Sequence, residues 1–207
     1  MKVAVSYLSS NDYKKCIEQI ENSKADFIHV DICDGNYVET NNIDMNQILN
    51  LLSNTQKKLN IHLMVRNPLD YIDKLKDLNV DVITIHNVNN ASSILNYIKS
   101  LGIKCGIAIN PNEKLKDFEK YYPIVDEVLV MSVMPGKGGQ KFMESVLKTI
   151  DSLNLIKNKY HFNMAIDGGI NSNTISLIKD KNLDLLISGS YITNSDNYDE
   201  NIDRLIS

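Results

Sequence analysis

The 207-residue sequence holds few cysteines: Cys16, Cys33 and Cys105 are the only three, and no two of them form a Cys-x-x-Cys pair. An odd number without that spacing argues against a disulfide framework. The sequence also lacks any apolar run close to the roughly 20 residues that span a bilayer, and residues 1–6 lack the apolar stretch of a signal peptide. We therefore expect a reduced, soluble, cytoplasmic protein with no membrane partner.

Positive charge is scarce and dispersed along the chain. The formal net charge is −4, and the Lys and Arg residues form no basic run. Nucleic-acid binders carry such a run or patch, so we expect no nucleic-acid partner. No low-complexity linker divides the chain, and a hydrophobic share of 43% suffices for one substantial core. The length then predicts a single domain over residues 1–207.

Short β-branched runs alternate with amphipathic stretches of helical length along the whole chain. This alternation is typical of βαβ units and a parallel sheet. The expected strands are Lys2–Ser6, Phe27–Asp31, Asn60–Met64, Val82–His86, Lys104–Ile109, Glu127–Met131, Asn163–Asp167 and Leu185–Ser188. The expected helices are Tyr13–Ile20, Met45–Leu52, Leu69–Leu78, Ala91–Ser100, Glu113–Tyr121, Lys141–Lys157, Ser172–Lys179 and Tyr198–Leu205.

Eight strands that alternate with eight helices predict an α/β fold of the closed (β/α)8, or TIM-barrel, type. An open doubly wound sheet usually has fewer strands, and it needs a glycine-rich turn after its first strand. Here that turn reads Leu8-Ser9-Ser10-Asn11, which contains no glycine. We therefore predict a single compact barrel domain.

Ionisable residues gather at the expected C-terminal ends of the strands, where barrels carry their catalytic groups. His29 and Asp31 are two apart on the second strand and share a face with Cys33. His62 lies on the third strand, and Asp167 ends the seventh. A single histidine of this kind is more often a hydrogen-bonded core residue, but the coincidence of two histidines with two carboxylates favours a site. Two nitrogen and two oxygen donors predict one divalent metal ion, such as Zn, Fe, Mn or Co.

Glycines and small polar residues follow the last two expected strands, as Gly168-Gly169 and Gly189-Ser190. Barrels commonly bind phosphate at this place, where a glycine lets the backbone N–H groups approach the anion. One such pair is more often only a turn, whereas two on neighbouring strands favour a phosphate site. A third cluster, residues 136–139, follows the sixth strand and is typical of either an ordinary long connection or a mobile loop that closes over a ligand.

In order and spacing, these motifs resemble the ribulose-phosphate 3-epimerase family from Ser6 to about Leu205. The matching segments are Ser6–Ser9, His29–Gly35, His62–Val65, Asn110-Pro111, Met131–Phe142, Asp167–Ile170 and Gly189-Ser190. The resemblance implies that His29, Asp31, His62 and Asp167 bind one catalytic metal ion, and that Asp31 and Asp167 also act as an acid–base pair. It implies that Ser6, His62, Gly136, Lys137, Gly138, Gly139, Gly168, Gly169, Gly189 and Ser190 bind a sugar phosphate. The favoured substrate is D-ribulose 5-phosphate, in the pentose phosphate pathway.

Epimerisation at C3 of a 2-ketose removes a proton α to a carbonyl group and returns one to the opposite face. This chemistry needs two acid–base groups on opposite sides of the substrate and positive charge that stabilises the enediolate. Carboxylates on the second and seventh strands can flank a substrate, and we expect metal coordination and burial to push their pKa values apart. We assign Asp31 as the base and Asp167 as the acid in the ribulose-to-xylulose direction, with exchanged roles in reverse.

The sequence departs from the family at several positions near this site. Cys33 stands where the family usually has methionine, and Asn36–Thr40 read Asn-Tyr-Val-Glu-Thr in place of His-Phe-Val-Pro-Asn. Met134 replaces asparagine and Lys137 replaces phenylalanine. Lys137 can reach a phosphate or be solvated, and the pattern favours neither. These departures keep a six-carbon substrate, such as D-allulose 6-phosphate, as the alternative.

Two other classes of protein share a phosphate-binding barrel. A non-catalytic sugar-phosphate binder is one alternative, although it has no use for both carboxylates and both histidines. A decarboxylase needs a lysine among the strand-end carboxylates, and an aldolase needs a Schiff-base lysine inside the barrel; the strand interiors contain neither. We also expect a homo-oligomer, since short barrels of this type commonly associate.

Overall fold

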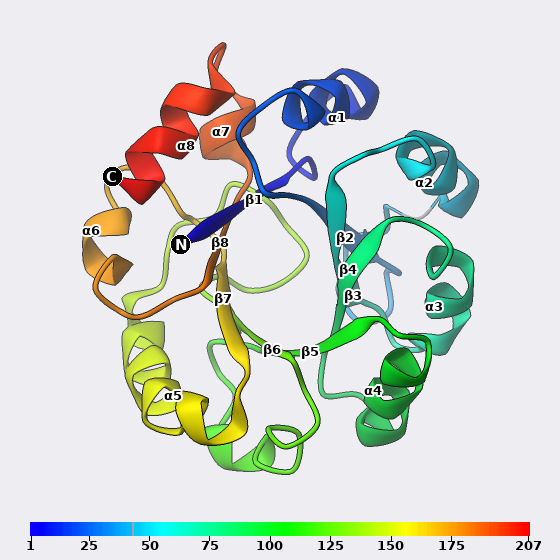
Figure 1. Cartoon of the computed structure of the whole chain (residues 1–207), viewed down its shortest axis with the longest axis vertical. Coiled ribbons are helices and arrows are strands. Elements are labelled where there is room, and N and C mark those ends of the chain that lie inside the picture. The colour runs from blue at the N-terminus through cyan, green and yellow to red at the C-terminus, as the bar shows by residue number, and fades with distance from the viewer. Residues whose placement is uncertain (43) are drawn as a thin grey trace.

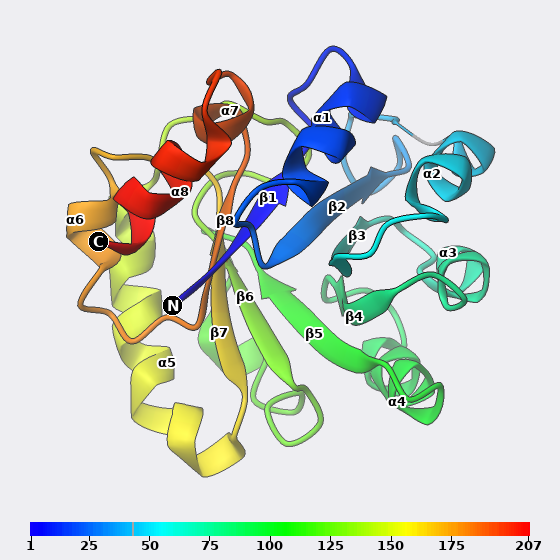
Figure 2. The ribbon, with the colours of Figure 1, turned by 45° about the horizontal axis from the view of Figure 1, so that its top comes forward.

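A computed structural model describes residues 1–42 and 44–207. Eight strands form one closed parallel barrel in chain order, with the helices outside it (Figures 1 and 2), which confirms the predicted (β/α)8 fold. The strands are β1 (Lys2–Ser6), β2 (Phe27–Cys33), β3 (Lys58–Met64), β4 (Val80–Ile85), β5 (Lys104–Ile109), β6 (Glu127–Met131), β7 (Asn163–Asp167) and β8 (Leu185–Ser188). The helices are α1 (Tyr13–Glu21), α2 (Met45–Leu52), α3 (Leu69–Leu75), α4 (Ala91–Ser100), α5 (Leu147–Tyr160), α6 (Ile175–Ile178), α7 (Ser190–Thr193) and α8 (Tyr198–Ile206), with 3₁₀ turns η1 (Leu115–Asp117) and η2 (Glu144–Val146).

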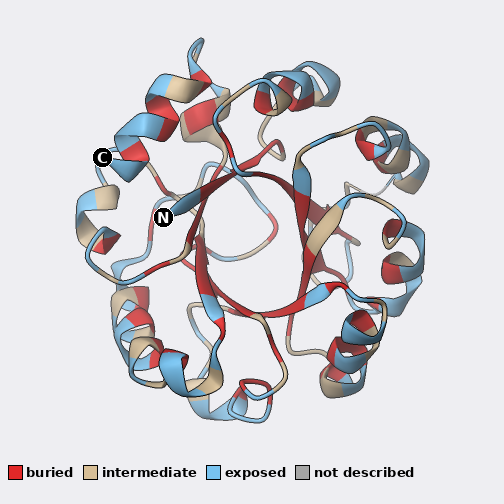
Figure 3. Cartoon of the chain, in the orientation of Figure 1, coloured by how far each residue is buried: buried red, intermediate tan, exposed pale blue. Residues whose placement is uncertain are grey.

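The strands are buried on both faces, because their side chains fill the barrel on one side and meet the helices on the other. Every residue of β2 is buried, and Figure 3 shows the helices buried mainly where they face the barrel. The register of β2 on β3 sets Asp31 opposite His62 and His29 opposite Asn60. The pairing of these two strands therefore places four polar side chains next to one another at one end of the barrel.

Local sequence fixes where several of the outer helices begin. Asp12, Asp44 and Asn197 stand at the starts of α1, α2 and α8, and each side chain accepts a backbone N–H of the first helical turn. Each helix then turns its apolar stripe toward the barrel. None of the helices among the described residues combines the length and the hydropathy needed to cross a membrane.

Several helices differ from the expected ones: the helix expected over Leu69–Leu78 ends at Leu75, and α7 was not expected. The segment expected as Glu113–Tyr121 makes only the turn η1, followed by backbone bonds from Phe118 N–H to Leu115 and from Tyr121 N–H to Phe118. These three apolar residues are three apart, a spacing that suits 3₁₀ turns better than the 3.6-residue period of an α-helix. The helix expected from residue 141 begins at residue 147, because the preceding residues form a loop over the barrel end; the one expected from 172 begins at 175.

The N-terminal end of the barrel is held together by aspartates that precede even-numbered strands. Asp26 accepts the backbone N–H of Val3 at 2.8 Å, and Asp184 accepts that of Met164 at 2.7 Å. These carboxylates tie the first residues of neighbouring strands to one another. Both carboxylates are bonded to the backbone, so their role in the fold is structural.

Candidate active site

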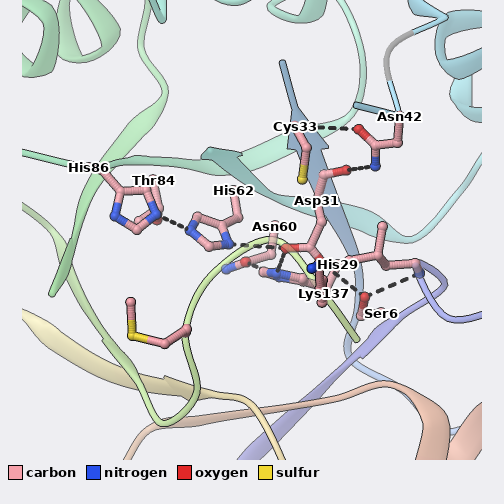
Figure 4. A network of polar contacts seen from close by, with 12 residues as sticks. Ser6, His29, Asp31, Cys33, Asn42, Asn60, His62, Thr84, His86 and Lys137 are labelled. Atoms are coloured by element: carbon pink, nitrogen blue, oxygen red, sulfur yellow. Dashed lines mark hydrogen bonds and ion pairs between the residues drawn. The ribbon is translucent and has the colours of Figure 1, made fainter. Parts of the chain in front are cut away.

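Two histidines and two carboxylates meet at the C-terminal end of the barrel. His29 and Asp31 come from β2, His62 from β3 and Asp167 from the end of β7. One potential ligand atom from each residue lies within 4.8 Å of the other three. Figure 4 shows the first three of these side chains turned toward one another. The convergence that the strand-end pattern predicts is therefore present in the fold.

The donor set suits a divalent metal ion. Two atoms bound to one zinc ion at about 2.0 to 2.2 Å lie no more than about 4.4 Å apart. The four atoms, which lie within 4.8 Å of one another, need only small side-chain movements to meet that limit. Imidazole nitrogens combined with carboxylate oxygens are ligands that Zn, Fe, Mn and Co all accept. The residues present thus fit the metal ion that the strand-end pattern predicts.

Asp31 is the most heavily bonded member of this group. Its Oδ1 lies 3.0 Å from His62 Nδ1 and 3.2 Å from His29 Nε2, and its Oδ2 accepts the hydroxyl of Ser6 at 2.8 Å. Burial alone would raise the pKa of Asp31, but the two histidines outweigh it and hold that pKa well below its usual range. Asp31 is therefore held as a carboxylate.

The second carboxylate has the opposite electrostatic environment. Burial, and then the negative charge of Asp31, raise the pKa of Asp167 to about 6. For His29, burial would lower the pKa, but Asp31 more than compensates and raises it to about 9. A cation that binds here has to displace the proton of His29. Two carboxylates whose pKa values diverge within one site are the usual arrangement of an acid–base pair.

A third histidine belongs to the same cluster, although sequence reasoning gave it no role. His86 follows β4, and its Nε2 lies 2.8 Å from His62 Nε2. Burial and the neighbouring His62 lower the pKa of His86 well below its usual value. The ring of Tyr37 lies 4.6 Å from that of His86, centroid to centroid. The role of His86 could have been inferred from its two-residue spacing from Thr84, which places both side chains on the same face of the strand.

A cavity of about 460 Å³ opens directly above the carboxylates. This volume lies within the usual range for small-molecule sites, about 300 to 1,000 Å³. Its walls include Ser6, Asp31, Gly136, Lys137, Gly138, Gly139, Asp167, Gly168, Gly169, Gly189 and Ser190. His29 and His62, both 0% exposed, lie beneath this wall rather than in it. The cavity thus brings together every expected substrate-contact residue except His62.

The turn after β7 packs so closely that it requires glycine. Gly169 has φ +66°, and a Cβ there would lie 2.6 Å from the backbone nitrogen of Phe142. Ser132, fully buried, donates its hydroxyl to the carbonyl oxygens of Asp167 and Gly168 at 2.8 and 2.6 Å. Sequence reasoning passed over Ser132, which fixes the backbone that presents Asp167 to the cavity.

The loop after β6 lies over the mouth of the cavity. Its shape is held by Gln140, whose side-chain amide donates to the carbonyl oxygens of Met134 and Lys137 at 2.6 and 2.7 Å. Lys137 Nζ lies 3.3 Å from the carboxylate of Glu39 in the loop after β2. Lys137 and Glu39 both depart from the family pattern, and they form an ion pair with each other. Both side chains are largely exposed, so the pair contributes little to stability.

Fold and cavity together define a (β/α)8 barrel with two histidines and two carboxylates at the base of a small-molecule cavity. The model of the ribulose-phosphate 3 epimerase family matches residues 2–193. The chain is 37% identical to ribulose-phosphate 3-epimerase of Helicobacter pylori strain J99, with 94% of this chain and 92% of that protein covered. It is 33% identical to the Synechocystis protein of the same name, with 97% and 90% covered. The chain belongs to the ribulose-phosphate 3-epimerase family and is an isomerase.

Solved structures of other barrel enzymes resemble this one in fold. The tryptophan synthase A-subunit from Pyrococcus furiosus matches with a TM-score of 0.73 at 11% identity, covering 100% of this chain and 97% of that one. N-(5'-phosphoribosyl)anthranilate isomerase from the same organism matches with a TM-score of 0.67 at 15% identity, covering 100% and 96%. At such identities the likeness concerns the fold alone.

Proposed function

We propose that this protein interconverts D-ribulose 5-phosphate and D-xylulose 5-phosphate by metal-dependent epimerisation at C3. The observation that carries the proposal is the pair Asp31 and Asp167, which share one cavity and have pKa values shifted in opposite directions. Epimerisation needs one group that removes a proton and another that supplies one. The proteins of this family from Helicobacter pylori and Synechocystis are named for the same reaction.

His29, Asp31, His62 and Asp167 would hold the divalent ion, which we expect to be Zn, Fe, Mn or Co. An ion bound there supplies positive charge that stabilises the negative charge developing on the substrate when C3 loses its proton. The contacts of Asp31 with both histidines hold three of these side chains in place before a ligand arrives. Little reorganisation is then needed for binding.

In the ribulose-to-xylulose direction, Asp31 takes the proton from C3 and Asp167 supplies a proton to the opposite face. The roles exchange in the reverse direction. Ser6 donates to one oxygen of Asp31 and so fixes the orientation of that carboxylate. Asp167, with its raised pKa, is the member of the pair better suited to carry a proton at neutral pH.

The substrate phosphate would lie against the turns after β7 and β8. Gly168, Gly169, Gly189 and Ser190 line that part of the cavity, and the first N–H groups of α7 have no partners within the helix. Anions bind well to backbone N–H groups arranged in this way. The loop that carries residues 136–139 covers the opposite wall and would keep water away from the reacting carbon.

Lys137 offers a side-chain contact to the phosphate. Among the described residues that line the cavity it is the single Lys or Arg side chain. We expect Lys137→Ala to raise KM about three- to tenfold with kcat almost unchanged, because an exposed charge–charge contact contributes about 1 kcal/mol. The increase should shrink at high salt. Glu39→Gln, which frees Lys137 from its present partner, is the matched control and should leave KM unchanged or lower it. If KM is unaltered in Lys137→Ala, Lys137 does not bind the phosphate and serves only the contact with Glu39.

The reaction itself is tested by incubating metal-loaded protein with D-ribulose 5-phosphate in D2O and following the sugar by NMR. We expect deuterium at C3 and formation of D-xylulose 5-phosphate, both abolished by a chelator. If the protein exchanges the C3 proton of D-allulose 6-phosphate but not that of D-ribulose 5-phosphate, the six-carbon alternative is the substrate. Absence of exchange on either sugar would leave a non-catalytic sugar-phosphate binder.

A further inference from the structure

A chain of polar side chains runs inside the barrel from one of the four candidate metal ligands, His29. His29, Asn60, Thr84 and Glu127 come from β2, β3, β4 and β6, and none of them is more than 7% exposed. Barrel interiors are normally filled by branched apolar residues. Four polar side chains in this place therefore call for an explanation, and the reaction proposed above uses only His29.

The four side chains are linked in sequence by hydrogen bonds. His29 Nδ1 lies 2.7 Å from Asn60 Oδ1 (Figure 4), and Asn60 Nδ2 lies 3.4 and 3.5 Å from the two carboxylate oxygens of Glu127. The contacts with Glu127 are long for hydrogen bonds. Thr84 donates its hydroxyl to Glu127 Oε1 at 3.1 Å. The chain thus runs from a candidate metal ligand to a carboxylate across the barrel.

The neighbouring strand leaves room for this chain. Gly106 on β5 pairs in register with Thr84 on one side and Glu127 on the other. A Cβ at Gly106 would lie 2.2 Å from the hydroxyl oxygen of Thr84. Any larger residue at position 106 would push Thr84 away from the carboxylate. The glycine is therefore a requirement of the Thr84–Glu127 contact.

Glu127 is a buried carboxylate without a cationic partner. No Lys, Arg or His nitrogen of the described residues lies within ion-pair distance of it. Burial raises the pKa of Glu127, whereas its contacts with Thr84 and Asn60 oppose that rise. An uncompensated buried charge is costly. The positive charge that also opposes this rise is that of His29, which is linked to Glu127 through Asn60.

We infer that Asn60 and Glu127 are positioning residues that fix which nitrogen of His29 faces the metal site. Glu127 accepts the amide N–H of Asn60, so the amide oxygen has to point to His29. That oxygen can only accept, so Nδ1 keeps its proton; when a divalent ion displaces the other proton of His29, the lone pair of Nε2 faces that ion. Outer partners of this kind typically change metal affinity about 10- to 100-fold. The inference rests on the metal site proposed above.

The test is Zn²⁺ affinity of the whole protein, measured by competition with a chelating dye. Asn60→Leu, which keeps the size of the side chain but removes its oxygen, should weaken Zn²⁺ binding about 10- to 100-fold. Glu127→Gln keeps an acceptor but removes the charge, and should weaken it severalfold. Asn201→Leu is the control, because this buried asparagine on α8 donates to Tyr191 O, outside the barrel. It should lower the Tm and leave Zn²⁺ affinity unchanged.

Two further readouts separate positioning from general loss of structure. In ¹⁵N NMR of the Zn²⁺-loaded wild type, His29 should carry its proton on Nδ1, and Asn60→Leu should lose that slowly exchanging proton. Asn60→Asp alone sets a second buried carboxylate beside Glu127 and should weaken Zn²⁺ binding. Adding Glu127→Gln to it places a single carboxylate directly on His29 and should restore the affinity to near that of the wild type.

Three results would overturn the inference. The first is wild-type Zn²⁺ affinity in folded Asn60→Leu and Glu127→Gln, and the second is failure of the double variant to recover the affinity lost in Asn60→Asp. The third is a Zn²⁺-loaded wild type with the proton of His29 on Nε2. A wild type that binds no Zn²⁺ would instead remove the metal site, and with it both proposals. That outcome is distinguishable because it appears before any variant is made.

Discussion

Asp31→Asn and Asp167→Asn should each abolish epimerisation, with kcat/KM lower by at least about 10³-fold. Either substitution removes a proton-transfer group and a candidate metal ligand at once. Asparagine has almost the same size as aspartate, so the packing around each position should persist. The measurement is the rate of D-xylulose 5-phosphate formation from D-ribulose 5-phosphate, at metal concentrations that saturate each variant.

The two variants should differ in the half-reaction that they retain. With Asp31 as the base for ribulose 5-phosphate, Asp167→Asn should still exchange the C3 proton of that sugar slowly with D2O, without forming xylulose 5-phosphate. Asp31→Asn should exchange only xylulose 5-phosphate. The difference follows from the side on which each carboxylate meets the substrate. Exchange of both sugars by both variants would show that the two carboxylates do not have separate faces.

A control for these variants is provided by Asp26→Asn at the opposite end of the barrel. Asp26 accepts the backbone N–H of Val3, and it has no contact with the cavity. This variant should lose some stability and keep its activity. Full activity in either Asp31→Asn or Asp167→Asn, with the metal bound, would contradict the two-carboxylate mechanism.

The barrel and the core of the site were predictable because they depend on local periodicity. In a parallel barrel, each strand ends at the same rim, so a polar residue at a strand end must lie near the others. His29 and Asp31 are two apart, and this spacing alone puts both side chains on the same face of their strand. The meeting of Asp31 with Asp167 follows from strand count and order, both of which the alternating pattern provides.

Contacts across the barrel and between loops were not predictable in the same way. Asn60 and Glu127 are 67 residues apart, and their contact depends on the tilt and stagger of the closed barrel. The pairing of Lys137 with Glu39 depends on how two loops pack, for which no periodic signal exists. The predicted start of α5 was wrong for a related reason. The loop over the cavity includes residues that the amphipathic pattern assigns to this helix. Tertiary packing decides these features.

Removal of the metal ion is the second change with a large expected effect. Dialysis against a strong chelator should lower kcat/KM by at least about 10³-fold, which corresponds to about 4 kcal/mol of transition-state stabilisation. The Tm should also fall, because an ion that binds only the folded protein stabilises it. Activity and metal content, the latter by elemental mass spectrometry, are measured after Zn²⁺, Fe²⁺, Mn²⁺ or Co²⁺ is restored singly.

The matched control is dialysis against the same chelator saturated with zinc, which exposes the protein to the chelator without withdrawing the ion. Epimerisation should survive this treatment. The chelated protein should still bind a sugar phosphate, because the turns around Gly168, Gly169 and Gly189 use backbone N–H groups that no ion holds. Undiminished turnover by the metal-free protein would show that the reaction does not require a metal ion. Asp31 would then stand as a base held by Ser6 and two histidines, and the positive charge that stabilises the reacting sugar would have to come from His29.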